Sequence, residues 1–223
     1  VILKVPITVT IPVGPNPANV RWLEECLRSL AAQTVLPSEV ILIDDSGRRI
    51  APSCELPYIL HTPVWRLGVA HAFNFGVALS SNELVIMLGS DDKLLPTCVE
   101  SCWRKWLSLE DYKGYYYMPV VYDDGRIQDI PCNAAMVTKS LWRSTGGFPV
   151  ESAVGAPDNV FISMLYAANG WLGNLYKVGE EPIYWYRAHP ETDTATRYHR
   201  YLPAIDWVKK IKTEEAKNGE VLK

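Results

Sequence analysis

The sequence lacks several features that would assign it quickly to a class of protein. It has no apolar run of the roughly 18 residues that a membrane-spanning helix needs, so we expect no transmembrane segment. Its five cysteines are an odd number without CxxC spacing, which argues against a disulfide framework or a zinc site. Residues 1–10 do not have the pattern of a secretory signal. We therefore expect a soluble, cytoplasmic protein.

The sequence also lacks a large net charge, internal repeats and low-complexity segments. The formal net charge is −3, which gives no general attraction to nucleic acid or to anionic membrane surfaces. What is present is an ordinary globular composition, with 48% hydrophobic and 21% charged residues in 223. This length suffices for one large domain with a sizeable core.

The first half of the chain alternates strand patterns with helical ones, which predicts a parallel α/β sheet. Strands are expected at Ile7–Val13, Glu39–Ile43, Tyr58–His61 and Val85–Leu88. A first helix is expected after an N-cap at Asn19, and the linker that follows this helix ends at Pro37. Two more helices are expected at 69–80 and 97–108, the second of them introduced by Leu94–Pro96. Cys98 and Cys102 are four residues apart and are expected to be core residues of that last helix.

The second half has shorter elements. Strands are expected at Tyr115–Tyr122, Arg126–Ile130, Ala134–Thr138, Lys177–Val178 and Ile183–Tyr186, with the first two joined as a hairpin through Asp123–Gly125. Helices are expected at Lys139–Ser144, 158–169 and 203–217. No linker divides the chain, so we expect a single domain of 1–223.

Two predicted strands each end in a pair of acids, Asp44–Asp45 and Asp91–Asp92. Ligands of open α/β sheets bind outside the carboxyl ends of the strands. Adjacent carboxylates there repel each other unless a divalent metal or polar ligand groups lie between them. The alternative is that these acids are solvated turn residues.

Taken together, residues 6–190 resemble family 2 glycosyltransferases of the A-type nucleotide-sugar fold. The matching segments, in order, are Thr8–Val13 with Leu27–Gln33, Glu39–Ser46, Arg66–Gly76, Leu88–Pro96, and Gly146–Phe148 followed by Asp158. The resemblance implies a Rossmann-like, mainly parallel central sheet flanked by helices, with a smaller mixed sheet on the acceptor side. It divides the domain into a nucleotide-sugar half (1–96), an acceptor half (97–190) and a helical extension (191–223).

The resemblance also implies residues that bind a nucleotide-sugar, most simply a UDP-sugar. One of Asp44 and Asp45 would bind the uracil or ribose, and Arg66 and Arg187 would reach the phosphates. The complete donor set is Pro12, Val13, Asp44, Asp45, Arg66, Asn74, Ser90, Asp91 and Arg187. For Asn74 the alternative is that it only braces a loop, and for the paired acids that they cap turns.

A divalent metal, Mn²⁺ or Mg²⁺, is implied at the Leu88–Pro96 segment. Asp91 matches the last acid of the family's D-x-D, Asp92 lies next to it, and His189 resembles the histidine that completes the metal shell. Gly89 stands where the family has its first acid, which places metal dependence in question. The alternative for Asp92 is that it caps the following helix.

On the acceptor side, the resemblance implies that Asp158 is the general base of an inverting transfer and that Gly146, Gly147 and Phe148 contact the acceptor. Asp158 alternatively only caps its helix. We therefore expect an inverting, metal-assisted glycosyltransferase whose acceptor is a saccharide, a lipid-linked sugar, a protein or a modified nucleic acid base. The alternatives are a catalytically degenerate binding module of this fold and a sugar nucleotidyltransferase, although Gly14–Pro17 lacks the cations of a phosphate loop.

Overall fold

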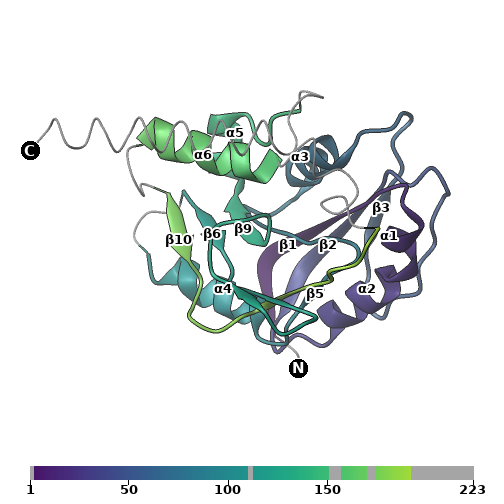
Figure 1. Cartoon of the computed structure of the whole chain (residues 1–223), viewed down its shortest axis with the longest axis horizontal. Helices are drawn as coiled ribbons and strands as arrows, with labels where there is room; N and C mark the ends of the chain where they lie inside the picture. The colour runs from purple at the N-terminus through teal and green to yellow at the C-terminus, as the bar shows by residue number, and fades with distance from the viewer. Residues whose placement is uncertain (1–2, 110–112, 151–156, 170–173, 192–223) are drawn as a thin grey trace, which may run out of the picture.

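A computed structural model describes residues 3–109, 113–150, 157–169 and 174–191 (Figure 1). The helices are α1 (Pro17–Arg21), α2 (Leu23–Ala31), α3 (Val69–Leu79), α4 (Cys98–Leu107), α5 (Lys139–Thr145) and α6 (Pro157–Asn169). The strands are β1 (Lys4–Val13), β2 (Leu36–Asp44), β3 (Ile59–His61), β4 (Leu84–Met87), β5 (Lys93–Leu94), β6 (Tyr115–Tyr117), β7 (Val120–Tyr122), β8 (Ile127–Gln128), β9 (Ala135–Thr138), β10 (Leu175–Lys177) and β11 (Tyr184–Tyr186).

Seven strands form the main sheet in the order β10-β6-β9-β4-β1-β2-β3. Of these seven, β9 alone runs antiparallel to its neighbours β4 and β6. Because β1, β2 and β4 are parallel, their carboxyl ends lie along one edge of the sheet. The predicted, mainly parallel α/β sheet is therefore confirmed.

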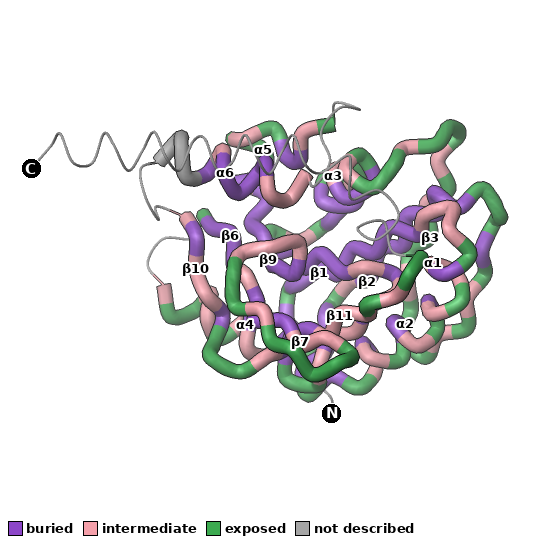
Figure 2. Tube along the Cα trace, viewed as in Figure 1, coloured by how far each residue is buried: buried purple, intermediate pink, exposed green. Residues whose placement is uncertain are grey.

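Helices cover both faces of the main sheet. On one face lie α3, α5 and α6 (Figure 1). An aromatic cluster that includes Phe73, Trp142, Phe148 and Phe161 is buried there. On the other face, α4 packs against β1 and β2 and α2 packs against β2, and Cys98 and Cys102 are fully buried there as predicted. The central strands are consequently buried along most of their length, while exposed residues gather in the connecting loops (Figure 2).

A smaller mixed sheet has the strand order β5-β11-β7-β8, with β11 parallel to β7 and antiparallel to β5. The prediction of one strand over Tyr115–Tyr122 is wrong, because β6 belongs to the main sheet and β7 to the small one. Pro119 lies between them and has no N–H for a ladder. Its carbonyl instead accepts a hydrogen bond from the amide of Ile183 (3.2 Å). The hairpin of β7 and β8 is confirmed.

Three predicted boundaries also differ. The first helix is capped by Asn16, whose Oδ1 accepts from the Ala18 amide at 3.0 Å, and not by Asn19. Pro37 lies inside β2 and not in a linker, and β5 separates the acidic turn from α4. The expected helix at 203–217 lies outside the described residues. Within the part of the chain that the structure describes, no helix combines the length and apolarity that crossing a membrane requires.

Candidate active site

A pocket of about 450 Å³ opens at the carboxyl edge of the main sheet. The end of β1 supplies Pro12, the loop after β1 supplies Asn16, and Asp45 follows directly after β2. The turn after β4, residues 89–92, also lines the pocket, as does Asp158 at the start of α6. Val13 is fully buried and does not line the pocket, although Pro12 does.

The turn of residues 89–92 is built around the small size of Gly89. A Cβ atom at this position would lie 2.6 Å from Asp92 Oδ2 and 3.1 Å from Asp91 Oδ1. The Gly89 amide donates to the Tyr184 hydroxyl at 3.1 Å, and its carbonyl accepts from the amide of Asp92 at 3.1 Å. An acid at position 89 therefore has no room unless its two carboxylate neighbours move.

Asp92 is buried and holds the 184–191 segment against the turn. Its carboxylate accepts hydrogen bonds from the Tyr184 hydroxyl (2.7 Å) and from the Arg187 amide (2.9 Å). Burial, and then the neighbouring charge of Asp91, raise the pKa of Asp92 to about 8. The alternative that Asp92 caps α4 is wrong, because the N-cap residue of that helix is Thr97. Its predicted metal role stays a prediction.

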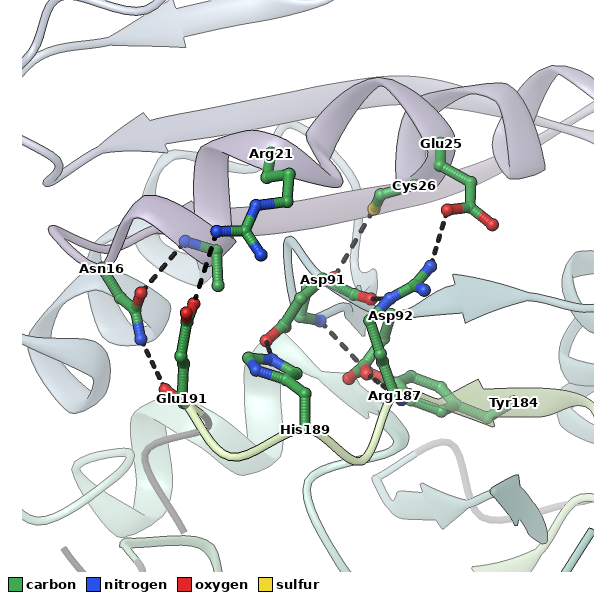
Figure 3. Close-up of polar contacts among 12 residues, drawn as sticks. Asn16, Arg21, Glu25, Cys26, Asp91, Asp92, Tyr184, Arg187, His189 and Glu191 are labelled. Atoms are coloured by element: carbon green, nitrogen blue, oxygen red, sulfur yellow. Dashed lines mark hydrogen bonds and ion pairs between the residues drawn. The ribbon is translucent and has the colours of Figure 1, made fainter. Parts of the chain in front are cut away.

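Asp91 and His189 form a close pair although they are far apart in the sequence. Asp91 Oδ2 lies 3.1 Å from His189 Nε2, and both side chains are largely buried (Figure 3). The imidazole packs against the indole of Trp22, with 4.6 Å between ring centroids. Its Nδ1 atom and the hydroxyl of Ser90 are buried without a hydrogen-bond partner among the described residues. The predicted proximity of residues 91 and 189 is therefore found.

The described part of the chain does not by itself provide three side-chain ligands for a metal. Among the described residues, no group of three or more His, Cys, Asp or Glu side chains is arranged to hold an ion. A carboxylate beside an imidazole nevertheless suits Mn²⁺. The two buried polar atoms without partners that were described above, the Ser90 hydroxyl and His189 Nδ1, belong to the acidic turn and to this imidazole. The residues present therefore fit a metal that takes its remaining ligands from substrate and water.

Arg187 is held away from the pocket, which differs from its expected place at the phosphates. Its guanidinium binds Glu25 on α2 (2.6 Å) and the main-chain carbonyl of Asp91 (2.9 Å) (Figure 3). It also lies 4.6 Å from the ring centroids of both Trp22 and Trp185. Arg187 therefore fixes the acidic turn, and a direct phosphate contact would require these bonds to open.

The Asp44–Asp45 pair arranges the loops beside the pocket. The Asp44 carboxylate accepts from the Ser46 amide (3.1 Å) and the Ile50 amide (3.0 Å), and Asp44 does not line the pocket. Asp45 does line it and accepts from the amides of Leu67 (2.6 Å) and Gly68 (2.8 Å). These bonds fix the loop that carries Arg66, which is the only Lys or Arg among the described pocket residues.

The Gly146–Phe148 segment is positioned by Asn74. The amide nitrogen of this side chain donates to the Phe148 carbonyl (2.8 Å), and its oxygen accepts from the Phe148 amide (2.9 Å). Asn74 therefore braces the loop. Gly146 and Gly147 have positive φ angles, and a Cβ at Gly147 would lie 2.5 Å from Asn74 Oδ1, so glycine is required structurally. Phe148 lines the pocket.

A second cavity of about 870 Å³ adjoins the pocket, and we call it the cleft. It lies beside β7, β8 and the segment after β11. Asp158, Asn133 and Tyr186 line both cavities. Burial raises the pKa of Asp158, and nearby backbone amides, including that of Asn133, partly offset this. A carboxylate thus lies at the boundary between two binding spaces.

Three supporting residues, Glu25, Tyr184 and Trp22, were not anticipated from the sequence. Glu25 binds Lys93 (2.8 Å) as well as Arg187, and both cations lower the pKa of this carboxyl. The partners of Glu25 are 68 and 162 residues away in the sequence, so no local pattern indicated them. From the sequence, Tyr184 is a strand residue. The hydrogen bonds of its hydroxyl group with Asp92 and Gly89 depend on the packing of β11 against the acidic turn.

Comparison with known proteins gave one family and a group of structures. The profile of the family "Glycosyl transferase family 2" matches residues 18–150. TarS of S. aureus in complex with UDP-GlcNAc is similar with a TM-score of 0.66 and 15% identity, over 83% of this chain and 59% of that one. A further crystal structure of S. aureus TarS gives a TM-score of 0.67 and 14% identity, over 92% of this chain and 39% of that one.

The mannosyltransferase PcManGT from Pyrobaculum calidifontis, in complex with GDP-Man and Mn²⁺, is also similar. Its TM-score is 0.53 and its identity 15%, over 95% of this chain and 75% of that one. No curated protein sequence matched the chain. The chain spans about three fifths of the TarS fragment that was solved with UDP-GlcNAc. These likenesses establish the fold as that of the A-type nucleotide-sugar glycosyltransferases.

Proposed function

The chain belongs to glycosyl transferase family 2, and on this premise we propose that it moves a sugar from a nucleotide-sugar to an acceptor hydroxyl with inversion at the anomeric carbon. The observation that carries the proposal is the position of Asp158, which lines both the pocket and the cleft. We assign the donor to the pocket and the acceptor to the cleft.

The pocket has the groups that a nucleoside diphosphate sugar needs. Arg66 supplies a cation, and the N-terminus of α3 at Gly68 and Val69 adds the positive end of a helix dipole. Asp45 offers a carboxylate for a ribose or base. We propose a UDP-sugar, in line with the UDP-GlcNAc bound by the similar TarS, while the GDP-Man of PcManGT makes a GDP-sugar the alternative.

Asp91 and His189 are the residues that would hold Mn²⁺ or Mg²⁺, and Asp92 next to Asp91 is the third residue of the predicted metal set. When bound, such an ion supplies positive charge that neutralises the departing diphosphate. Asp91→Ala should therefore weaken nucleotide binding in the presence of Mn²⁺ much more than in its absence, as measured by calorimetry. Equal affinities of variant and parent under both conditions would remove Asp91 from this role.

Asp158 is assigned the role of general base. The acceptor oxygen attacks the anomeric carbon, its proton passes to the Asp158 carboxylate, and the bond from carbon to the diphosphate oxygen breaks. The raised pKa of Asp158 makes its carboxylate a better proton acceptor than an exposed aspartate. Attack from the cleft, opposite the leaving diphosphate in the pocket, gives inversion.

Two alternatives make different predictions. A degenerate binding module would bind nucleotide without releasing it from a sugar. A nucleotidyltransferase would need cations in the phosphate loop after β1, but the pocket residues of that loop are Gly14, Pro15 and Asn16.

The test is a panel of UDP-, GDP- and TDP-sugars with Mn²⁺, followed by thermal shift and by release of the nucleoside diphosphate. A ligand that binds the native state raises its Tm. Stabilisation together with release supports the transferase. Stabilisation without any release, with or without added glycosides as acceptors, supports the binding module instead.

A further inference from the structure

Resting on the proposed function, we infer that the acceptor bound in the cleft is an uncharged saccharide. The inference rests on three properties of the described cleft residues: aromatic walls, amide side chains and the absence of lysine and arginine.

Flat aromatic rings form part of the wall. Tyr122 on β7 and Tyr186 on β11 both line the cleft, with 5.1 Å between their ring centroids. Rings that combine an apolar face with a polar edge suit the C–H face of a pyranose, whose hydroxyls point sideways. Gln128, Asn133 and Asn159 also line the cleft, and amides both donate to and accept from hydroxyl groups.

Charge separates the cleft from the pocket. No lysine or arginine belongs to the described cleft residues, and the acid among them is Asp158. Three cations that adjoin cleft residues in the sequence, or that bind an acid adjoining them, are paired with acids. These pairs are Arg126 with Asp124 at 2.6 Å, Lys177 with Asp129 at 2.6 Å, and Arg187 with Glu25 at 2.6 Å. His189 also lines the cleft, but it is assigned with Asp91 to the metal that would bind the donor diphosphate. Away from that corner, a phosphate-bearing acceptor would meet the negative charge of Asp158 and no lysine or arginine among the described cleft residues.

The main chain of two of the strands that line the cleft, β7 and β11, is closed to an extended peptide, while β8 is an edge strand. Both β7 and β11 are interior strands of the small sheet, so their amide and carbonyl groups are paired within it. Strand addition, which needs an open edge, is therefore blocked along these two walls. The volume of about 870 Å³ is in the upper part of the range of about 300–1,000 Å³ that is usual for small-ligand sites. This favours a saccharide of more than one ring.

The test compares three classes of acceptor with the full chain and the donor found in the panel above. The probes are p-nitrophenyl glycosides of glucose, galactose and N-acetylglucosamine, the 6-phosphates of the same glycosides, and a serine- and threonine-containing hexapeptide. The readout is nucleoside diphosphate release above that with donor alone. We expect at least one neutral glycoside to exceed its 6-phosphate by about tenfold, equivalent to ~1.4 kcal/mol. Equal or greater stimulation by a phosphorylated glycoside or by the peptide overturns the inference, as does the absence of stimulation by any neutral glycoside.

Two isoleucines provide a matched pair of variants. Ile127 and Ile130 are exposed to a similar extent, 63% and 60%, but only Ile130 lines the cleft. Ile130→Lys adds the missing cation and should raise the use of the 6-phosphate relative to the neutral glycoside about tenfold. Ile127→Lys should leave this ratio unchanged. Equal ratios in both variants would show that charge in the cleft does not select the acceptor.

Failure of the proposed function is separable from failure of the acceptor inference. If no nucleotide-sugar is turned over, saturation-transfer NMR of the same three probes measures binding without donor chemistry. The inference is supported even then if the parent protein binds a neutral glycoside more strongly than its 6-phosphate. In that case Ile130→Lys should reverse this preference and Ile127→Lys should not. Preferential binding of the phosphate or of the peptide by the parent protein, or no binding of any probe, overturns it.

Discussion

Replacing Gly89 with alanine should destabilise the protein, although glycine at this position looks like a simple departure from the family's acidic motif. The added Cβ would lie 2.6 Å from Asp92 Oδ2, a distance that real side chains do not tolerate. Asp92 cannot retreat freely, because the Tyr184 hydroxyl and the Arg187 amide hold its two oxygens. Gly89→Asp should be worse still, since it adds a third carboxylate to the turn.

Forcing extra atoms into a packed site costs about 1–3 kcal/mol. In a domain of this size, 1 kcal/mol shifts Tm by about 2–4 °C, so Gly89→Ala should lower Tm by roughly 2–12 °C. Differential scanning calorimetry gives this value, and urea unfolding gives the change in free energy. Gly179→Ala is the control, because no atom lies within 4 Å of the Cβ it would add.

A double-mutant cycle identifies the cause. Asp92→Ala removes the oxygen that the new Cβ meets, so the double variant with Gly89→Ala should be more stable than the sum of the single effects predicts. The coupling should be about 0.5–3 kcal/mol, as for residues in direct contact. Unchanged stability of Gly89→Ala, or additive effects in the cycle, would refute the explanation that Gly89 is required by its carboxylate neighbours.

Other residues give independent predictions. Asn74→Ala should cost about 1–3 kcal/mol in unfolding free energy, because the amide and carbonyl of Phe148 lose their partners; unchanged urea unfolding would contradict the bracing role. Glu25→Gln should lower kcat/KM for the donor while the exposed Glu24→Gln on the same helix does not, and equal effects would remove this positioning role. The kcat/KM of transfer should fall as pH decreases through the raised pKa of Asp158, above the ordinary aspartate range, because the base must be ionised; a fall only at ordinary aspartate pH would contradict it.

Much of the fold was predictable because its signals are local. The buried runs of β1, β2 and β4 follow from their apolar pattern, and the loop after β1 follows from its glycine and prolines. The split of β6 from β7 was not predictable, because both strands are apolar and aromatic and only tertiary pairing assigns them to different sheets. Asn16 replaced Asn19 as cap because Pro17 suits the first helical position.

The location of the site was easier to predict than the hydrogen bonds and ion pairs between its side chains. Asp45, Arg66, Asp91 and Asp158 gather around one pocket as expected from the carboxyl edge of a parallel sheet. The sequence assigned Arg187 to the phosphates, yet in the structure it binds Glu25 and the main chain of the acidic turn. Such contacts depend on side-chain directions across 96 and 162 residues of chain, which periodicity does not encode.

Acceptor-dependent release of nucleoside diphosphate by Asp158→Asn, measured beside the parent protein, tests the central proposal most directly. The carboxamide keeps the size of the side chain but cannot accept the acceptor's proton, and loss of a general base typically costs about 10²–10⁴-fold in rate. The control is Asp124→Asn, an exposed acid of the β7–β8 hairpin that lines neither cavity. We predict a loss of at least about 10²-fold for Asp158→Asn with donor affinity retained. Transfer at the parent rate by Asp158→Asn would contradict the proposal that Asp158 activates the acceptor.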